Sequence, residues 1–234
     1  EGCRFCQAGM QYRPIRERPV EEIVDALLRW TEKTGWEEIG LVSLASCDYS
    51  GLEDVMERLK PMLEQKRVKL SLPSLRMDAF SVGLAAALEP VRRGGLTFAP
   101  EAGTQRLRNV INKGVSDEDI ESTLEAAFSR GWERIKLYFM MGLPTETRED
   151  LEGIAKISER AAAIGRAHKK RTEIAVSIAG FVPKPHTPFQ WEKQATVEEL
   201  SERGRFVKRL VNNRHVTVRY HESEQTWLEG VFAR

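Results

Sequence analysis

Short apolar runs alternate along this chain with longer segments of helical periodicity, and this alternation constrains the fold more than any other feature. Strands that are apolar on both faces and are separated by helices belong in a parallel sheet covered by helices. The strands are predicted at residues 38–45, 68–72, 96–99, 134–141, 173–182 and 216–220. The helices are predicted at 20–34, 52–65, 77–88, 116–130, 147–164 and 196–211, with a last helical piece near the carboxyl end.

Local signals support the helix boundaries. Pro19 is placed to begin the first helix and Gly35 to follow it. Ser116, with Asp119 three residues later, resembles a capping box at the start of a helix. The repeated strand–helix order, without a G-x-G-x-x-G segment, favours a barrel over a dinucleotide-binding fold.

We therefore expect an α/β fold, a partial (β/α)6 barrel of the TIM type. Its 234 residues contain no linker and no low-complexity stretch, so residues 1–234 are predicted to form one domain. In such a barrel the chemistry collects on the loops that leave the carboxyl ends of the strands. The loop of the first cysteines would be the first of this set, which places its strand before Glu1.

Composition excludes several classes of protein. The chain has 36 basic and 35 acidic residues, so no overall charge favours nucleic acid or an anionic membrane. Its apolar stretches, such as residues 82–88, are too short to span a bilayer, and no signal segment opens the sequence. Three cysteines are too few for a disulfide framework, which predicts a reducing, cytoplasmic setting.

Two of the three cysteines form a Cys-x-x-Cys pair, Cys3 and Cys6. Two thiolates at this spacing bind one iron or zinc ion, or hold two corners of an iron–sulfur cluster. The alternatives are a surface redox pair, half of a zinc site and a chance pair. Zinc is disfavoured because the chain has no second Cys-x-x-Cys and its four histidines are scattered. A thioredoxin-like motif would open a helix directly, whereas residues 7–19 separate Cys6 from the first helix.

The segment "GCRFCQAG" at residues 2–9 resembles the end of the Cys-x-x-x-Cys-x-aromatic-Cys signature of the radical S-adenosylmethionine (radical SAM) superfamily. In that signature an aromatic residue precedes the third cysteine, as Phe5 precedes Cys6. The resemblance implies that Cys3 and Cys6 are the second and third ligands of a [4Fe–4S] cluster. The first ligand would lie four residues before Cys3, so the sequence is expected to begin inside the cluster loop, in a form that holds a cluster poorly and is inactive.

Further segments resemble the methylthiotransferase and Elongator-like subgroup. Residues 12–27 resemble its Arg-Pro-rich lead into the first helix. Residues 139–154 resemble its loop of Gly, an aromatic residue or Leu, then Pro-Gly-Glu-Thr, with Thr145 in place of a common Gly. Residues 181–189 resemble a later segment in which His186 replaces a usual Gly. The matching residues are Gly142, Leu143, Pro144, Glu146, Thr147, Lys184, Thr187 and Pro188.

Residues 2–18 and 99–114 are most similar to uncharacterised Fe–S oxidoreductases that are often joined to a cobalamin-binding-type domain. This resemblance implies that other domains of the same polypeptide exist and that cobalamin takes part if such a domain is present. It also implies an electron donor such as flavodoxin or ferredoxin. The substrate stays open among RNA, protein and small molecules, and no membrane partner is expected.

The resemblance also implies contacts with SAM, each of which has an ordinary structural alternative. Ser46 and Asp48 offer acceptors for its ammonium or cap a helix, and Glu101 accepts from the ribose or the ammonium or is a plain loop acid. A cation for the SAM carboxylate would come from a basic helix face that is otherwise only solvated. The expected SAM-binding set is Phe5, Ser46, Asp48, Glu101, Arg108, Lys113, Met141, Gly142, Leu143, Pro144 and Lys184.

The favoured function is therefore that of a radical SAM enzyme, which cleaves SAM reductively to a 5′-deoxyadenosyl radical and modifies a substrate with it. Catalytic residues that act on the substrate are not identified. Two other classes of protein stay open. One is a non-catalytic barrel scaffold with a degenerate cluster site that binds a protein or nucleic acid, and the other is a zinc-dependent β/α hydrolase.

Overall fold

The computed structural model describes residues 2–43, 46–71, 77, 95–168 and 171–233. Four parallel strands form the larger sheet, each paired with the next along the chain: β3 (Leu96–Glu101), β4 (Arg134–Met141), β5 (Glu173–Gly180) and β6 (Val216–Tyr220). A smaller parallel sheet holds β1 (Glu38–Gly40) and β2 (Lys69–Ser71).

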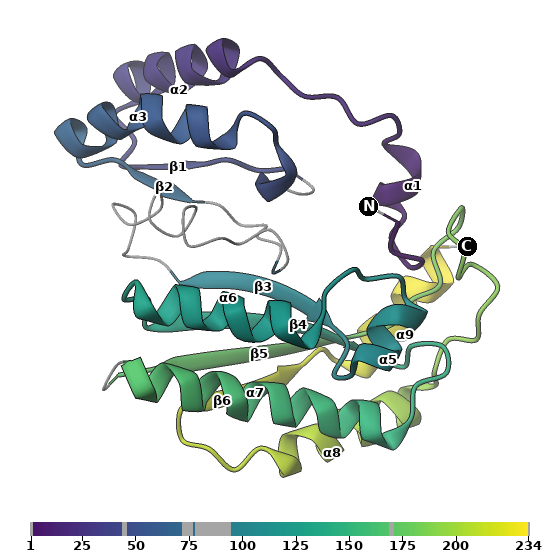
Figure 1. The fold of residues 1–234 in the computed structure, drawn as a ribbon. Helices are drawn as coiled ribbons and strands as arrows, with labels where there is room; N and C mark the ends of the chain where they lie inside the picture. The colour runs from purple at the N-terminus through teal and green to yellow at the C-terminus, as the bar shows by residue number, and fades with distance from the viewer. Residues whose placement is uncertain (1, 44–45, 72–76, 78–94, 169–170, 234) are drawn as a thin grey trace.

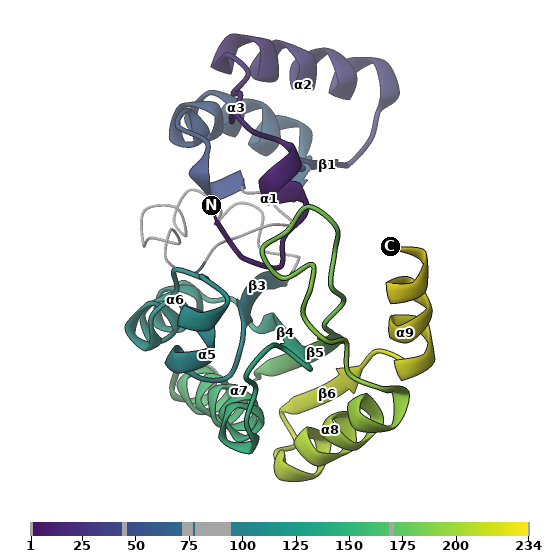
Figure 2. The same cartoon turned by 90° about the vertical axis from the view of Figure 1, so that its right-hand side faces the viewer.

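Helices cover one face of each sheet. Figure 1 shows α2 (Val20–Thr34) and α3 (Leu52–Lys66) over the smaller sheet, and α6 (Asp117–Ser129), α7 (Arg148–His168) and α8 (Val197–Leu210) along the larger one. In both views the helices lie on the outside and the sheets turn their other faces towards each other (Figures 1 and 2). This arrangement confirms an α/β fold with parallel strands and the form of a partial barrel. That residues 1–234 form a single domain stays a prediction.

The two faces of the larger sheet differ in burial. On β4, Ile135, Leu137 and Phe139 are buried against the helices, whereas Lys136 and Tyr138 point to the other face and are only half-buried. Strand β5 alternates in the same way. The main apolar core therefore lies between the sheets and their helices, and the inner faces are left for polar chemistry.

Several elements differ from the sequence prediction. Strand β1 covers Glu38–Gly40 of the predicted 38–45, of which residues 44 and 45 lie outside the described part of the chain. The Ser46 hydroxyl, at the start of the short helix η1 (Ser46–Asp48), donates to the Leu41 carbonyl (3.2 Å). Two short helices were not predicted, α1 (Ala8–Gln11) and α5 (Gln105–Val110). The predicted carboxyl-terminal helix is α9 (Ser223–Phe232). Most of the predicted helix at 77–88 lies outside the described residues. None of the described helices is both long and apolar enough to cross a membrane.

The predicted capping box at the start of α6 is confirmed. The Ser116 hydroxyl accepts from the Asp119 backbone N–H (3.0 Å), and the Asp119 carboxylate accepts from the Ser116 N–H (2.8 Å). We expect Ser116→Ala to lower the free energy of unfolding by about 1 kcal/mol, because one amide of the first turn loses its acceptor. Urea denaturation measures this difference.

Ser122 supplies the control for this variant. Its exposed hydroxyl donates only to the Asp119 carbonyl (3.2 Å) within the same helix. Ser122→Ala is expected to stay within about 0.5 kcal/mol of the wild type. Equal effects of the two variants would show that the cap does not stabilise α6.

Candidate functional site

The cysteine loop is held between the loops that follow β3 and β5. The Arg4 N–H donates to the Ile111 carbonyl (2.9 Å), and the Arg4 carbonyl accepts from the Phe189 N–H (3.2 Å). The Asn112 amide donates to the Gly2 carbonyl (2.8 Å). Although it comes first in the sequence, this loop therefore lies at the carboxyl ends of the larger sheet (Figures 1 and 2).

Cys3 and Cys6 belong to one tight turn at this rim. The Cys6 N–H donates to the Cys3 carbonyl (3.1 Å), and the Gly9 N–H donates to the Cys6 sulfur (3.3 Å). Cys3 is buried and Cys6 half-buried. A backbone N–H directed at a cysteine sulfur is one of the contacts that tune the potential of an iron–sulfur cluster. The donor set thus fits two corners of such a cluster.

The third corner is not found in this part of the molecule. Among the described residues, no three His, Cys, Asp or Glu side chains gather closely enough to hold a metal ion. That the first cysteine of the signature precedes Glu1 stays a prediction. Cluster ligation by Cys3 and Cys6 stays a prediction.

Phe5, between the two cysteines, packs against a small apolar cluster at the same rim. In this cluster the rings of Phe181 and Phe189 meet edge to face, with 6.0 Å between centroids. Since the members come from the loops after β3, β4 and β5, the aromatic residue of the motif fixes the cysteine loop to all three. The buried members are Ala102, Leu107, Ile111, Leu143, Phe181 and Phe189.

Glu101 and Lys113 form a largely buried ion pair beside this cluster. Glu101 ends β3 with a positive φ of 69°, and its carboxylate lies 3.3 Å from the Lys113 ammonium. Burial raises the pKa of Glu101, and the charge of Lys113 opposes that rise. The structure therefore brings together two of the residues that were predicted separately as SAM contacts.

Arg108 has a different environment from the one predicted. It is fully buried, and its guanidinium donates to the carbonyls of Val115 (2.9 Å) and Ala102 (3.1 Å) and pairs with Asp117. These contacts join α5 to the β3 loop and to the start of α6. The geometry gives Arg108 a structural role, because its donors already have acceptors within the protein.

The loop after β4 carries four of the predicted SAM contacts. The Met141 side chain is buried on the helix-facing side of the sheet, so only its backbone reaches the rim. Gly142 has a φ of 79°, which glycine adopts without strain. Leu143 is buried in the rim cluster, and Pro144 is half-buried.

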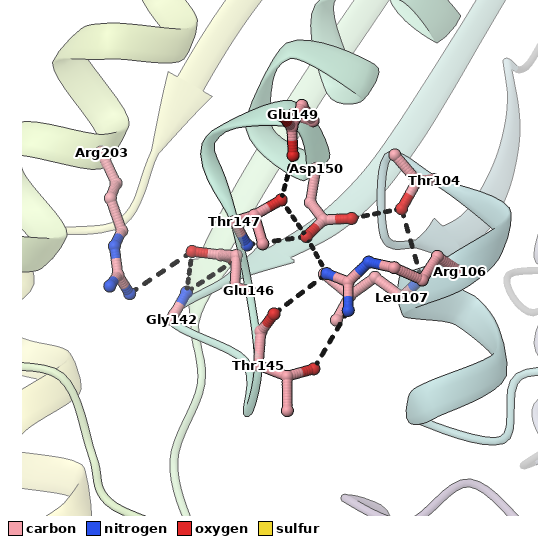
Figure 3. Close-up of polar contacts among 10 residues, drawn as sticks. All are labelled: Thr104, Arg106, Leu107, Gly142, Thr145, Glu146, Thr147, Glu149, Asp150 and Arg203. Atoms are coloured by element: carbon pink, nitrogen blue, oxygen red, sulfur yellow. Dashed lines mark hydrogen bonds and ion pairs between the residues drawn. The ribbon is translucent and has the colours of Figure 1, made fainter.

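Glu146 closes this loop onto itself, a role that the sequence did not indicate. Both of its carboxylate oxygens accept from the Gly142 N–H (3.0 and 2.9 Å), and Arg203 of α8 lies 3.3 Å away (Figure 3). The side chain is only 2% exposed. Burial raises the pKa of Glu146 to about 7, although the Gly142 hydrogen bonds and the charge of Arg203 act in the opposite direction.

A pH-dependent stability follows from this pKa. A carboxyl group whose folded pKa is raised stabilises the fold at low pH and loses that contribution as the pH rises towards the folded value. As the pH rises from the ordinary pKa of 4.5 to about 7, ionisation of Glu146 should lower the free energy of unfolding of the wild type by up to about 3 kcal/mol. We expect Glu146→Gln to remove most of this loss, as measured by urea denaturation at pH 5 and pH 8.

Glu149→Gln is the matched control, because Glu149 is an exposed carboxylate three residues away whose side chain accepts from Thr147 (3.0 Å). It should keep the pH dependence of the wild type. An identical pH dependence in Glu146→Gln and in the wild type would contradict the assignment.

Asp150 joins the β3 loop to the start of α7. It accepts from the backbone N–H (2.7 Å) and hydroxyl (3.0 Å) of Thr147, from the Thr104 hydroxyl and from Arg106 (Figure 3). Burial alone would raise the pKa of Asp150, but the hydrogen bonds from Thr104, Thr147 and Arg106 outweigh it and lower the pKa. The spacing of Thr147 and Asp150 is that of a helix cap, the one signal in the sequence that indicates this contact.

Two residues that stand where the resembled families have glycine lie in the left-handed backbone region. Thr145 and His186 each have a φ of 63°. An L-residue with a side chain adopts this conformation at a cost, which explains why glycine is common there.

The remaining predicted residues lie elsewhere or have other partners. Ser46 is buried, and its hydroxyl is bonded locally, whereas Asp48 is exposed at the end of η1. Lys184 is at the rim but pairs with Glu229 of α9. The contacts of these three residues with SAM stay predictions.

Comparison with known proteins defines the class. A family model described as the radical SAM superfamily matches residues 1–158, and the chain belongs to that superfamily. Members of the superfamily are enzymes that use a [4Fe–4S] cluster and SAM, which confirms the resemblance drawn from the cysteine segment.

Individual proteins give a finer comparison. The chain is 29% identical over 234 residues to an uncharacterised protein of Methanocaldococcus jannaschii, MJ0966, an alignment that covers 99% of this chain and 49% of MJ0966. The chain spans about half the length, or less, of the curated relatives that it matches.

Solved structures support the fold. The archaeal Methanocaldococcus infernus Elp3 superposes with a TM-score of 0.58 at 15% identity, covering 92% of this chain and 60% of Elp3. Streptococcus suis SuiB, bound to S-adenosylmethionine, superposes with a TM-score of 0.56 at 9% identity, covering 93% of this chain and 44% of SuiB.

Proposed function

We propose that this chain is the core of an enzyme that binds a [4Fe–4S] cluster and SAM and cleaves SAM reductively to modify a further substrate. The observation that carries the proposal is the Cys3–Phe5–Cys6 turn, held at the strand-end rim by the loops after β3 and β5 in a radical SAM chain. When bound, the cluster supplies the electron that cleaves SAM to methionine and a 5′-deoxyadenosyl radical. In this proposal a donor such as flavodoxin or ferredoxin reduces the cluster.

The residues of the cysteine turn have separate tasks. Cys3 and Cys6 supply two thiolates, and the Gly9 N–H stabilises the charge on the Cys6 sulfur. Phe5 keeps the turn in place through the rim cluster. The third thiolate would come from a cysteine four positions before Cys3.

The neighbouring loops would bind SAM. The Glu101–Lys113 pair presents a carboxylate and an ammonium at the end of β3, and the amino acid part of SAM carries the complementary charges. Beside it, the backbone from Met141 to Pro144 presents polar groups and an apolar edge suited to adenine. Such fixed groups orient the bound molecule before reaction.

The test uses a polypeptide that includes the residue four positions before Cys3. It is reconstituted with iron and sulfide without oxygen and reduced with dithionite in the presence of SAM. The proposal predicts cluster absorbance and formation of 5′-deoxyadenosine. A folded protein without cluster absorbance would contradict it and favour the non-catalytic scaffold, and bound zinc without sulfide would favour the hydrolase.

A further inference from the structure

The inner face of β4, β5 and β6 carries two cationic side chains that the site described above does not use. Buried core residues alternate along each strand with Lys136 on β4 and with Arg219 on β6. Both cationic side chains therefore point away from the covering helices. Lys136 is half-buried and Arg219 exposed. Both therefore face the side of the barrel on which a radical enzyme would keep its substrate.

Lys136 has a defined neighbour on this face. Its ammonium lies 4.6 Å from the centre of the Tyr138 ring, two residues further along β4. A cation over an aromatic face keeps its charge and its donors available for a ligand. The ring also restricts where the ammonium lies.

Arg219 borders an open, shallow hollow at the edge of β6. Thr217 of the same strand and Lys208 of α8 line it, together with Val211, Val216 and Val218. The hydroxyl and the cations are suited to an anion, and a guanidinium binds phosphate or carboxylate through two parallel hydrogen bonds.

The strand between them leaves room for a ligand. In the parallel register, Ala175 lies between Lys136 and Thr217, and Ser177 lies between Tyr138 and Arg219. Their side chains are small, and at strand spacings of about 4.8 Å the two cations stand about 12 Å apart at the backbone. Two long side chains over that distance can contact one ligand with two anionic groups.

On the inner side of β4, β5 and β6, no described acid pairs with Lys136 or Arg219. The acid on the inner side of β5, Glu173 at its start, pairs with Arg134 (3.7 Å) and Arg171 (3.6 Å). The other inner-facing residues of these strands are neutral or basic, at 136–140 of β4, at 175–179 of β5, and at Thr217 and Arg219 of β6. The inner side of these three strands therefore carries a net positive charge.

We propose that this inner face binds an anionic substrate, and that Lys136 and Arg219 determine the preference for a phosphate- or carboxylate-bearing molecule. The proposal rests on the proposed function, since it names the class of molecule that the radical would modify. Anion binding by the face can nevertheless be measured without a cluster, so the two proposals fail independently.

Isothermal titration calorimetry of the full-length protein, without reductant, uses pyrophosphate in one arm and succinate in the other. We expect at least one anion to bind. Lys136→Gln and Arg219→Gln should each weaken its Kd about tenfold, and the double variant should bind at least 50-fold more weakly. Binding of pyrophosphate alone identifies a phosphate ligand, and binding of succinate alone identifies a carboxylate.

Lys156→Gln, which removes an exposed cation on α7, is the control and should bind as the wild type does. Circular dichroism checks that the variants fold. We expect them to fold because Lys136 is only half-buried and Arg219 is exposed. Failure of both anions to bind the wild type, or wild-type affinity in the folded double variant, would overturn the proposal. Loss of 5′-deoxyadenosine formation with anion binding intact would count only against the proposed function.

Discussion

Replacing Gly153 with alanine is expected to lower the free energy of unfolding by about 3 kcal/mol or more, and Tm by roughly 6–12 °C. A Cβ at Gly153 would lie 2.2 Å from the carbonyl oxygen of Gly103 and 2.6 Å from its carbonyl carbon. Both atoms are backbone, so no side chain can turn away. Either α7 or the β3 loop must move.

The same movement should disturb the candidate site. Gly103 follows Glu101 by two residues, and the neighbouring Thr104 bonds to Asp150 of α7. A shift of this loop would alter the Glu101–Lys113 pair, so SAM binding should weaken together with stability.

Gly114→Ala is the matched control. A Cβ there meets no atom within 4 Å, and the backbone has no positive φ. It should change the unfolding free energy by no more than about 0.5 kcal/mol. Thermal and urea denaturation measure the stabilities of the two variants. Equal stabilities would contradict the close packing of α7 against the β3 loop.

Replacing Cys6 or Cys3 with serine is expected to reduce cluster iron to background and to abolish 5′-deoxyadenosine formation. A hydroxyl is a poor substitute for a thiolate on iron, and each replacement leaves one iron without its protein ligand. Iron and sulfide analysis after reconstitution, with the visible absorbance of the cluster, measures the loss in the polypeptide that includes the residue four positions before Cys3.

Cys47→Ser is the control, since Cys47 is the one other cysteine of the chain and has no predicted role. It should keep the iron content of the wild type. A Cys6→Ser protein with full iron would remove Cys6 from the site, and loss of iron in Cys47→Ser would place Cys47 in it.

The strands and helices of the larger sheet follow from patterns within short segments, which is why the sequence predicts them. Strand β4 is found at its predicted bounds, 134–141, because apolar or aromatic residues occupy position 135 and positions 137–141. The capping box of Ser116 lies within four residues and is equally visible. The cysteine turn follows from a motif whose residues are adjacent in the chain.

The parts that the sequence does not predict depend on contacts between distant segments. Glu146 meets Arg203 of α8, and Thr104 meets Asp150 across the β3 loop. No local spacing indicates either pair. Arg108 was predicted from its charge as a SAM contact, whereas its full burial follows from how α5 folds against the start of α6.

Electron paramagnetic resonance of the reduced, reconstituted protein, in a polypeptide that includes the residue four positions before Cys3, tests the central claim most directly. If Cys3 and Cys6 hold a [4Fe–4S] cluster with one iron open to SAM, the reduced sample should show a cluster signal whose g-values change when SAM is added. The Cys6→Ser protein should show no such signal. A wild-type spectrum that SAM leaves unchanged, or no cluster signal at all in the folded protein, would contradict the account.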